Sequence, residues 1–415
     1  MIKFNNKLFN LFLFLLISHN CLSKTIKVGP HQNIKYLADA VAAANNFDTI
    51  LVDKSIYFAK NFEITKPLVF IGINYPVLDG EGKYQVVSIK SSNVIFQGFK
   101  IQHSSVSGLE DVAGIKIINS KKVIIRNNIL EDTFFGIYSQ YSQDCLIENN
   151  SLTSYRKFEQ EAGNGIHCWK SDSIRIINNK ITGHRDGIYL EFVTNSLIWR
   201  NISTKNIRYG LHFMFSHNDS YISNIFKNNG AGVAVMFTKH VKMFSNYFEE
   251  NWGDASYGLL LKEISDSYIQ GNIFKKNTIG IHMEGTSRIK MKKNQFISNG
   301  FAIQIQASCD SNTLTENNFI GNTFDIGTNG SLVLNNFDKN YWDKYDGYDL
   351  NKDKIGDIPY RPISMFSMIV ERNPPVMILF RSFMVSLLDK TEKMLPSLTP
   401  ENLKDNFPLM KAIKL

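Results

Sequence analysis

An Asn-x-apolar triplet recurs through the middle of this chain with a period near 22 residues. Only the fourth repeat departs from the pattern, because Ser203 stands where the apolar residue is expected. Self-similarity at such a period is the signature of stacked repeats, in which each repeat adds one layer to a continuous core. The repeat therefore predicts a solenoid, and the informative features become columns of side chains. The triplets begin at Asn128, Asn150, Asn179, Asn201, Asn224, Asn246, Asn272, Asn294 and Asn317.

Each repeat also contains a glycine followed by an aliphatic residue, usually eight or nine positions after the asparagine. In two repeats this gap is longer, which predicts insertions in one turn, at residues 154–162 and 251–256. The runs between the turns are short, alternate apolar with polar residues and are bounded by Gly, Asn, Asp or Ser, as is typical of strands. Leucine-rich repeats have a similar period but carry leucine at fixed offsets. We therefore predict an all-β fold, a right-handed single-stranded parallel β-helix over residues 49–337.

The repeated asparagines are predicted to be structural. An asparagine side chain at one corner of a coil can bond the same residue of the next coil, and asparagine tolerates the left-handed backbone of turns. The apolar residue two positions later is expected to stack inside the core. These residues are Leu130, Leu152, Ile181, Phe226, Phe248, Phe274, Phe296 and Phe319.

The open ends of a solenoid need caps. Residues 24–48 are predicted to form the N-terminal cap, because apolar residues from Ile34 to Ala44 fall on one helical face. Residues 338–415 are predicted to form a C-terminal helical or irregular segment. Within it, residues 376–380 and 383–388 are almost wholly apolar but too short to span a membrane. This part either caps the solenoid or docks on a partner.

The start of the chain predicts secretion. Lys3 and Lys7 precede an apolar run at residues 8–17, so residues 1–23 resemble a signal peptide. Its removal takes away two lysines and changes the formal net charge from +8 to +6. No basic block is present, so nucleic acid is not an expected partner. The remaining cysteines, Cys145, Cys168 and Cys309, are odd in number and do not indicate a disulfide scaffold.

The strand after each repeat glycine allows two outward-facing columns to be aligned, with neighbouring strands about 4.8 Å apart. The first column contains Tyr138, His167, Tyr189, His212, Ala234, Leu260, His282 and Gln304. The second column contains Gln140, Trp169, Glu191, Met214, Met236, Lys262, Glu284 and Gln306.

This alignment places Met214 next to Met236, with His212 on the same face. Thioether and imidazole groups on neighbouring strands suit a soft ion such as Cu(I). His217 and His240 lie in the following turns and are further candidate ligands. The competing interpretation is that an inserted loop or a partner protein covers this face.

Acidic residues in and beside these columns are candidates for a catalytic role. Many parallel β-helix proteins act on polysaccharides through paired carboxylates. The candidate acids here are Asp186, Glu191, Glu263 and Glu284, and their positions do not form a tight cluster. A secreted polysaccharide lyase or glycoside hydrolase therefore remains the alternative function.

An acidic stretch after the repeats resembles the first half of a calcium-binding loop. Asp349, Asn351, Asp353 and Asp357 offer oxygen ligands mostly at alternate positions, but the bidentate acid of the twelfth position is missing. A structural Ca²⁺ is one interpretation, and a hydrogen-bonded turn is the other.

Five blocks of the chain resemble the NosD family. Among them are the Gly-His-Arg-Asp-Gly-Ile-Tyr-Leu-Glu-Phe run at 183–192 and the Gly-Leu-His-Phe-Met-Phe-Ser-His run at 210–217. The likeness is most specific in the middle third of the chain and is also carried by residues 230–236, 257–264 and 340–345.

The resemblance implies a periplasmic accessory protein of nitrous-oxide reductase maturation, built as a right-handed β-helix. It implies work with an ABC transporter pair, an ATPase and a permease, and with a copper-chaperone lipoprotein, in copper-site assembly of nitrous-oxide reductase. Membrane contact would then run through the permease only. No hydrolytic centre carries over from the resemblance, so a non-enzymatic role is expected.

Overall fold

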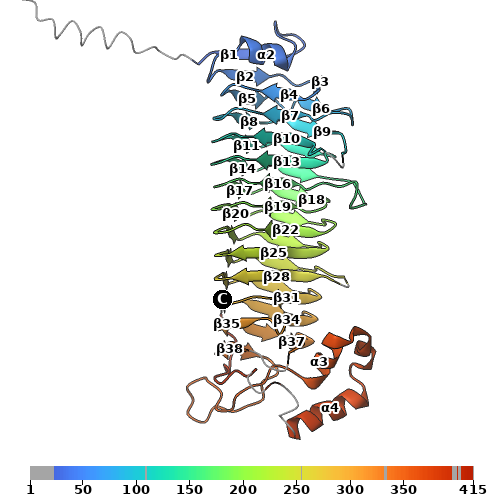
Figure 1. Cartoon of the computed structure of the whole chain (residues 1–415), viewed down its shortest axis with the longest axis vertical. Helices are drawn as coiled ribbons and strands as arrows, with labels where there is room; N and C mark the ends of the chain where they lie inside the picture. The colour runs from blue at the N-terminus through green and yellow to red at the C-terminus, as the bar shows by residue number, and fades with distance from the viewer. Residues whose placement is uncertain are drawn as a thin grey trace, which may run out of the picture.

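The chain forms one stacked parallel β-helix with three long sheets, as the repeat predicts (Figure 1). The computed structural model describes residues 23–107, 110–253, 255–330, 334–394, 400 and 403–414. Within these residues the sheets contain 14, 12 and 13 strands, and every neighbour in a sheet comes from the adjacent coil. Residues 1–22 of the predicted signal peptide lie outside the described part of the chain.

The strands of the three sheets follow one another in each coil. The 14-stranded sheet contains β1 (Thr25–Val28), β2 (Thr49–Val52), β5 (Val69–Gly72), β8 (Ile95–Gln97), β11 (Ile124–Arg126), β14 (Leu146–Glu148), β17 (Arg175–Ile177), β20 (Leu197–Trp199), β23 (Ser220–Ile222), β26 (Lys242–Phe244), β29 (Tyr268–Gln270), β32 (Lys290–Lys292), β35 (Asp310–Thr315) and β38 (Leu334–Asp338). The 12-stranded sheet contains β4 (Phe62–Ile64), β7 (Val87–Ile89), β10 (Ala113–Ile118), β13 (Phe135–Gln140), β16 (Ile166–Trp169), β19 (Ile188–Glu191), β22 (Tyr209–Met214), β25 (Ala231–Lys239), β28 (Tyr257–Ser265), β31 (Ile279–Glu284), β34 (Phe301–Ile305) and β37 (Phe324–Thr328). The 13-stranded sheet contains β3 (Ile56–Phe58), β6 (Val77–Asp79), β9 (Lys100–Gln102), β12 (Ile129–Glu131), β15 (Ser151–Thr153), β18 (Lys180–Thr182), β21 (Ile202–Thr204), β24 (Ile225–Lys227), β27 (Tyr247–Glu249), β30 (Ile273–Lys275), β33 (Gln295–Ile297), β36 (Asn318–Ile320) and β39 (Tyr341–Trp342).

Helices lie at both ends of the stack. The helix α2 (Leu37–Ala43) covers the N-terminal end, as predicted. The sheets nevertheless begin earlier and end later than residues 49–337, because β1 pairs with β2 and β39 pairs with β36. The C-terminal end carries α3 (Met365–Arg372), the 3₁₀ helix η1 (Pro374–Leu379) and α4 (Phe383–Met394). None of the helices in the described ranges is long and apolar enough to span a membrane.

The two predicted insertions occupy the same turn in their coils. One separates β15 from β16 and the other separates β27 from β28. Both lie on the path from the 13-stranded sheet into the 12-stranded sheet. Extra residues at this turn therefore lie beside the outer face of the 12-stranded sheet.

The asparagine ladder is confirmed and is entirely buried. In the regular pattern, the amide nitrogen Nδ2 of each asparagine donates to Oδ1 of the asparagine in the next coil, as between Asn201 and Asn224 at 3.0 Å. The same amide also donates to a backbone carbonyl, for example that of Ile176 at 2.8 Å. The ladder runs from Asn128 to Asn340. It satisfies backbone groups at a corner where no strand partner is available.

A second asparagine ladder runs beside the first and was not predicted. Each member follows a first-ladder asparagine by five residues, and Asn206 Nδ2 donates to Asn229 Oδ1 at 2.8 Å. The constant offset of five is visible in the sequence and could have identified it. Its members are Asn206, Asn229, Asn251, Asn277, Asn299 and Asn322.

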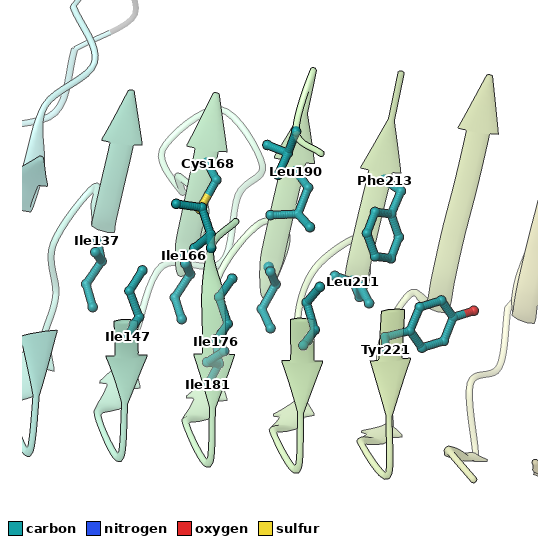
Figure 2. Close-up of a cluster of buried hydrophobic side chains, with 14 of the residues drawn as sticks. Ile137, Ile147, Ile166, Cys168, Ile176, Ile181, Leu190, Leu211, Phe213 and Tyr221 are labelled. Atoms are coloured by element: carbon teal, nitrogen blue, oxygen red, sulfur yellow. The ribbon is translucent and has the colours of Figure 1, made fainter. Parts of the chain in front are cut away.

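The core is built from columns of like side chains, as Figure 2 shows for the middle coils. The predicted core residues are buried, and from Phe226 the column becomes a continuous stack of rings. Ring centroids in this stack are 4.6 Å apart between Phe248 and Phe274 and 4.0 Å apart between Phe319 and Trp342. Ser203 keeps its place in the column because its hydroxyl donates to the carbonyl of Gly210 at 2.7 Å.

The three described cysteines are free and buried, which agrees with the absence of a disulfide scaffold in the prediction. Burial raises the pKa of the Cys145 thiol to about 11. The thiols therefore pack as small apolar groups.

A buried histidine makes the stability of this coil dependent on pH. His184 occupies the second-ladder position one coil before Asn206, and neither ring nitrogen has a hydrogen-bond partner among the described residues. Burial lowers the pKa of His184 from 6.5 to about 4. Its neutral form is favoured in the folded state, so its contribution to stability is present above pH 6.5 and lost as pH falls towards 4.

We expect His184→Asn to remove this acid sensitivity, because asparagine is neutral and fits the ladder. The difference in stability between variant and wild type should grow by about 2–3 kcal/mol from pH 7 to pH 4.5, at about 1.4 kcal/mol per pKa unit. Urea unfolding at both pH values measures it, with the exposed His31→Asn as the matched control. A difference that is the same at both pH values would contradict the prediction.

Candidate functional site

The two predicted outer columns are confirmed in register along the 12-stranded sheet. Tyr189 pairs with His212, which pairs with Ala234, and Glu191 pairs with Met214, which pairs with Met236. The side chains of each column therefore stand on adjacent strands. This sheet brings together residues that are more than 20 positions apart in the sequence.

The first column is largely buried, although it points away from the coil interior. Six of its eight residues are buried, and their aromatic rings cover one another. Ring centroids are 4.8 Å apart between Tyr138 and His167, 4.8 Å between His167 and Tyr189, and 4.7 Å between Tyr189 and His212. Asn164, just before β16, places its Nδ2 3.4 Å from His167 Nδ1. Burial lowers the pKa of His167 to about 3, with a smaller contribution from the charge of Arg185.

The two methionines stand side by side at the rim of this buried column. Met214 ends β22 and pairs with Met236 of β25, and both side chains are half-buried. The hydroxyl of Tyr189 donates to Met214 Sδ at 3.5 Å. Beyond them the chain turns a corner at Phe215 and Phe237, which have positive φ and rings stacked 5.0 Å apart. The two thioethers thus lie beside the rings of Tyr189, Phe215 and Phe237, which we term the aromatic wall. Each methionine side chain is only half-buried and so remains partly exposed to solvent.

His212 faces a carboxylate that the sequence alignment did not place there. Its Nδ1 lies 3.7 Å from Asp186 Oδ2, and both side chains are buried. Asp186 Oδ1 accepts from the backbone N–H of Tyr209 at 3.2 Å. Two guanidinium groups balance the charge of Asp186, since the Nε atoms of Arg208 and Arg185 lie 3.5 and 4.0 Å from its oxygens.

The other two predicted ligands lie around the corner from the methionines. His217 follows the turn at Phe215, and its Nδ1 accepts from the backbone N–H of Lys239 at 3.3 Å. Burial lowers the pKa of His217, and the charges of Lys239 and His240 lower it further. His240 is exposed at a residue with positive φ. The five predicted ligands therefore divide into His212, Met214 and Met236 on one side of the corner and two histidines on the other.

The acidic loop is a hydrogen-bonded turn. Asp349 accepts from the backbone N–H groups of Asp353 and Lys354 at 3.2 and 2.9 Å. The carboxylate of Asp357 accepts from Leu350 N–H at 2.7 Å, and Asn351 bonds Asp353. Within the described residues no group of three His, Cys, Asp or Glu side chains is arranged to hold a metal ion. The calcium interpretation of Asp349, Asn351, Asp353 and Asp357 has no support, because backbone N–H groups already use these oxygens.

The C-terminal helices have one buried and one exposed face. Phe366 and Val370 of α3 and Val385 of α4 pack with Phe324 at the end of the stack. The opposite face exposes Ile378 and other apolar side chains, which we term the C-terminal apolar patch. Its members are Ile378, Leu379, Phe383, Met384 and Leu387.

Comparison with known proteins places these features in a family. Residues 151–351 match the family model described as "Periplasmic copper-binding protein (NosD)". The matched range contains β15 to β39 and includes His212, Met214 and Met236.

Two curated relatives match over most of their length. The chain is 25% identical over 371 residues to a "Probable ABC transporter binding protein NosD" of Stutzerimonas stutzeri, covering 84% of both chains. It is also 25% identical over 373 residues to the protein of the same name in Pseudomonas aeruginosa, covering 85% of this chain and 86% of the relative.

Solved structures share the fold at low sequence identity. The surface adhesin PfbA of Streptococcus pneumoniae matches with a TM-score of 0.57 at 12% identity, over 70% of this chain and 86% of that chain. The catalytic unit of a GH87 α-1,3-glucanase from Streptomyces thermodiastaticus matches with a TM-score of 0.54 at 12% identity, over 74% and 65%. These likenesses show the β-helix alone. The family model and the two relatives, which match over most of their length, together support the assignment of this chain to the NosD family.

Proposed function

We propose that this protein is a periplasmic accessory protein of nitrous-oxide reductase maturation that carries copper as cargo for an ABC transporter complex. The family description names copper binding in the periplasm, and the relatives are named as ABC transporter binding proteins. In this proposal the partners are an ATPase and permease pair, a copper-chaperone lipoprotein and nitrous-oxide reductase. The protein itself acts as a scaffold and not as an enzyme.

The observation that carries the proposal is the pairing of Met214 with Met236 on adjacent strands beside His212. Two thioethers and an imidazole form a soft donor set that suits Cu(I). Both methionines are half-buried, so a partner can reach the sulfur atoms while the aromatic wall limits access of water. His217 and His240 flank this group across the corner and would extend it to an incoming ion.

The alternative, a polysaccharide lyase or glycoside hydrolase, rests on Asp186 and Glu191. These acids lie at opposite ends of β19. Five residues of extended chain separate them by roughly 16 Å at about 3.3 Å per residue. Glycosidase carboxyl pairs are about 5–9.5 Å apart. The spacing therefore favours the cargo-carrying role.

Titration with Cu(I) tests the site directly. The purified wild type is expected to bind one equivalent in competition with a Cu(I) chelator. Met214→Leu/Met236→Leu keeps the side-chain volume but removes both sulfur atoms, and should weaken binding at least tenfold, about 1.4 kcal/mol. Met243→Leu is the matched control and should bind like the wild type, because Met243 is buried in the core on β26 of the 14-stranded sheet. Equal affinity in all three proteins would exclude this site.

The C-terminal apolar patch supports the proposed transporter contact. Ile378 is 89% exposed and Phe383 is 83% exposed. Contiguous exposed apolar side chains of this kind mark interaction sites in soluble proteins. Because the other face of α3 and α4 already packs on the solenoid, the helices can cap the stack and present the patch at the same time.

A further inference from the structure

We propose that Asp186 is a positioning residue, which holds His212 in the tautomer that presents its Nε2 lone pair to the copper ion. The inference rests on the proposed copper role of His212 and Met214. It adds Asp186 to the proposed copper site as a residue that does not itself bind the ion. A neutral imidazole has one donor and one acceptor nitrogen, so the partner of one nitrogen decides the state of the other.

The first support is that an oxygen of Asp186 and a ring nitrogen of His212 face each other, while neither has a hydrogen bond among the described residues. Among the described residues, Asp186 Oδ2 and both ring nitrogens of His212 have no hydrogen-bond partner. His212 Nδ1 and Asp186 Oδ2 are 3.7 Å apart, so a small rotation of the ring would form an N–H···O bond. Buried polar atoms are rarely left unsatisfied, and this contact satisfies both.

The second support is the way in which the carboxylate is fixed. Asp186 lies just before β19 and His212 lies on β22, so neighbouring coils of one sheet set their distance. The backbone N–H of Tyr209 holds Oδ1, and Arg208 and Arg185 lie within 3.5 and 4.0 Å of the carboxylate. Oδ1 accepts from Tyr209 and faces Arg208, whereas Oδ2 faces His212 Nδ1 at 3.7 Å and Arg185 Nε at 4.0 Å, so the imidazole is the nearer of its two neighbours.

The third support is that two aromatic rings pack against the imidazole. The ring centroids of Tyr189 and Tyr209 lie 4.7 and 4.9 Å from that of His212. These contacts limit the orientations that the buried imidazole can adopt. With Nδ1 turned to Asp186, the remaining edge carries Nε2. The hydroxyl of the same Tyr189 contacts Met214 Sδ, which places this histidine and the thioether around one tyrosine. Histidines that bind metals commonly donate their other N–H to a carboxylate in this way.

Nitrogen-15 NMR of the histidine rings tests the inference in the metal-free protein. Wild-type His212 is expected to carry its proton on Nδ1 at neutral pH. Asp186→Asn should lose this preference and populate the Nε2–H form, and its Cu(I) affinity should fall about 10–100-fold. Asp219→Asn is the matched control, because Asp219 is also buried and also has one oxygen without a partner among the described residues. It should change neither the tautomer nor the affinity.

Each outcome separates this inference from the proposed function. A wild-type His212 with its proton on Nε2 would overturn the role of Asp186, even if copper binds, and this measurement does not require the variant to fold. An unchanged Cu(I) affinity in a folded Asp186→Asn would overturn it as well. A protein that shows the Nδ1–H tautomer but binds no Cu(I) would refute the copper role and leave the Asp186–His212 contact standing.

Discussion

Replacing Asp405 with alanine is expected to destabilise the C-terminal end of the solenoid by about 3–5 kcal/mol, as losses from buried charged networks do. Asp405 is fully buried and ends the first asparagine ladder, where the next coil would otherwise supply an acceptor. Its Oδ2 accepts from Asn340 N–H, Asn340 Nδ2 and Trp342 Nε1 at 2.9, 3.0 and 3.2 Å. Its Oδ1 accepts from the N–H groups of Lys339 and Phe407, both at 3.1 Å. Alanine would leave five donors without an acceptor.

The matched test compares Asp405→Ala, Asp405→Asn and the exposed Asp39→Ala. Asparagine keeps the shape but turns an amide N–H₂ towards groups that are themselves donors, so it should also destabilise. Urea unfolding gives the overall loss, and hydrogen exchange of the amides at 336–345 shows whether the last coil opens first. Surface substitutions ordinarily change the free energy of unfolding by no more than about 0.5 kcal/mol. If the free energies of unfolding of Asp405→Ala and Asp39→Ala differ by no more than this, the idea that the Asp405 carboxylate ends the ladder is refuted.

The architecture was predictable because a stacked fold repeats the same local problem in every coil. The steps between the triplet asparagines fixed the register, and both outer columns follow from it. The second asparagine ladder was overlooked although its offset is constant. Its polar side chains look like ordinary turn residues until the amides of successive coils are considered together. The ladder terminus at Asp405 was beyond prediction, because the tail returns to Asn340 across 65 residues without any repeat.

The candidate site was only partly predictable, because strand register predicts which residues are neighbours but not where side chains outside the strands point. Register placed His212, Met214 and Met236 together, because strand pairing determines such neighbours. It did not place Asp186 beside His212, since Asp186 lies before β19, where simple alternation of side chains does not apply. Burial of the first column was also not predicted. It results from aromatic rings on successive coils that cover one another, which depends on packing between coils.

The C-terminal apolar patch gives the second large expected effect. Its members project from η1 and α4, away from the residues that pack on β37. A charge placed in the centre of an interface must be desolvated on binding, whereas on a free surface it costs little. Ile378→Glu/Phe383→Glu should therefore leave folding intact and weaken association with the ATPase–permease pair about 100-fold, as loss of interface anchors does.

Binding of the full-length protein to the permease complex in lipid nanodiscs measures this effect. Phe58→Glu is the matched control, because Phe58 is also a highly exposed aromatic residue but lies in β3 at the opposite end of the solenoid. Retained binding by Phe58→Glu together with loss in the double variant assigns the transporter contact to the C-terminal end. Equal binding by the double variant and the wild type would exclude the patch as the contact. If the proposed copper site is correct, Cu(I) binding at Met214 and Met236 should be unchanged in the double variant, since these methionines lie in β22 and β25 and the C-terminal apolar patch lies in η1 and α4.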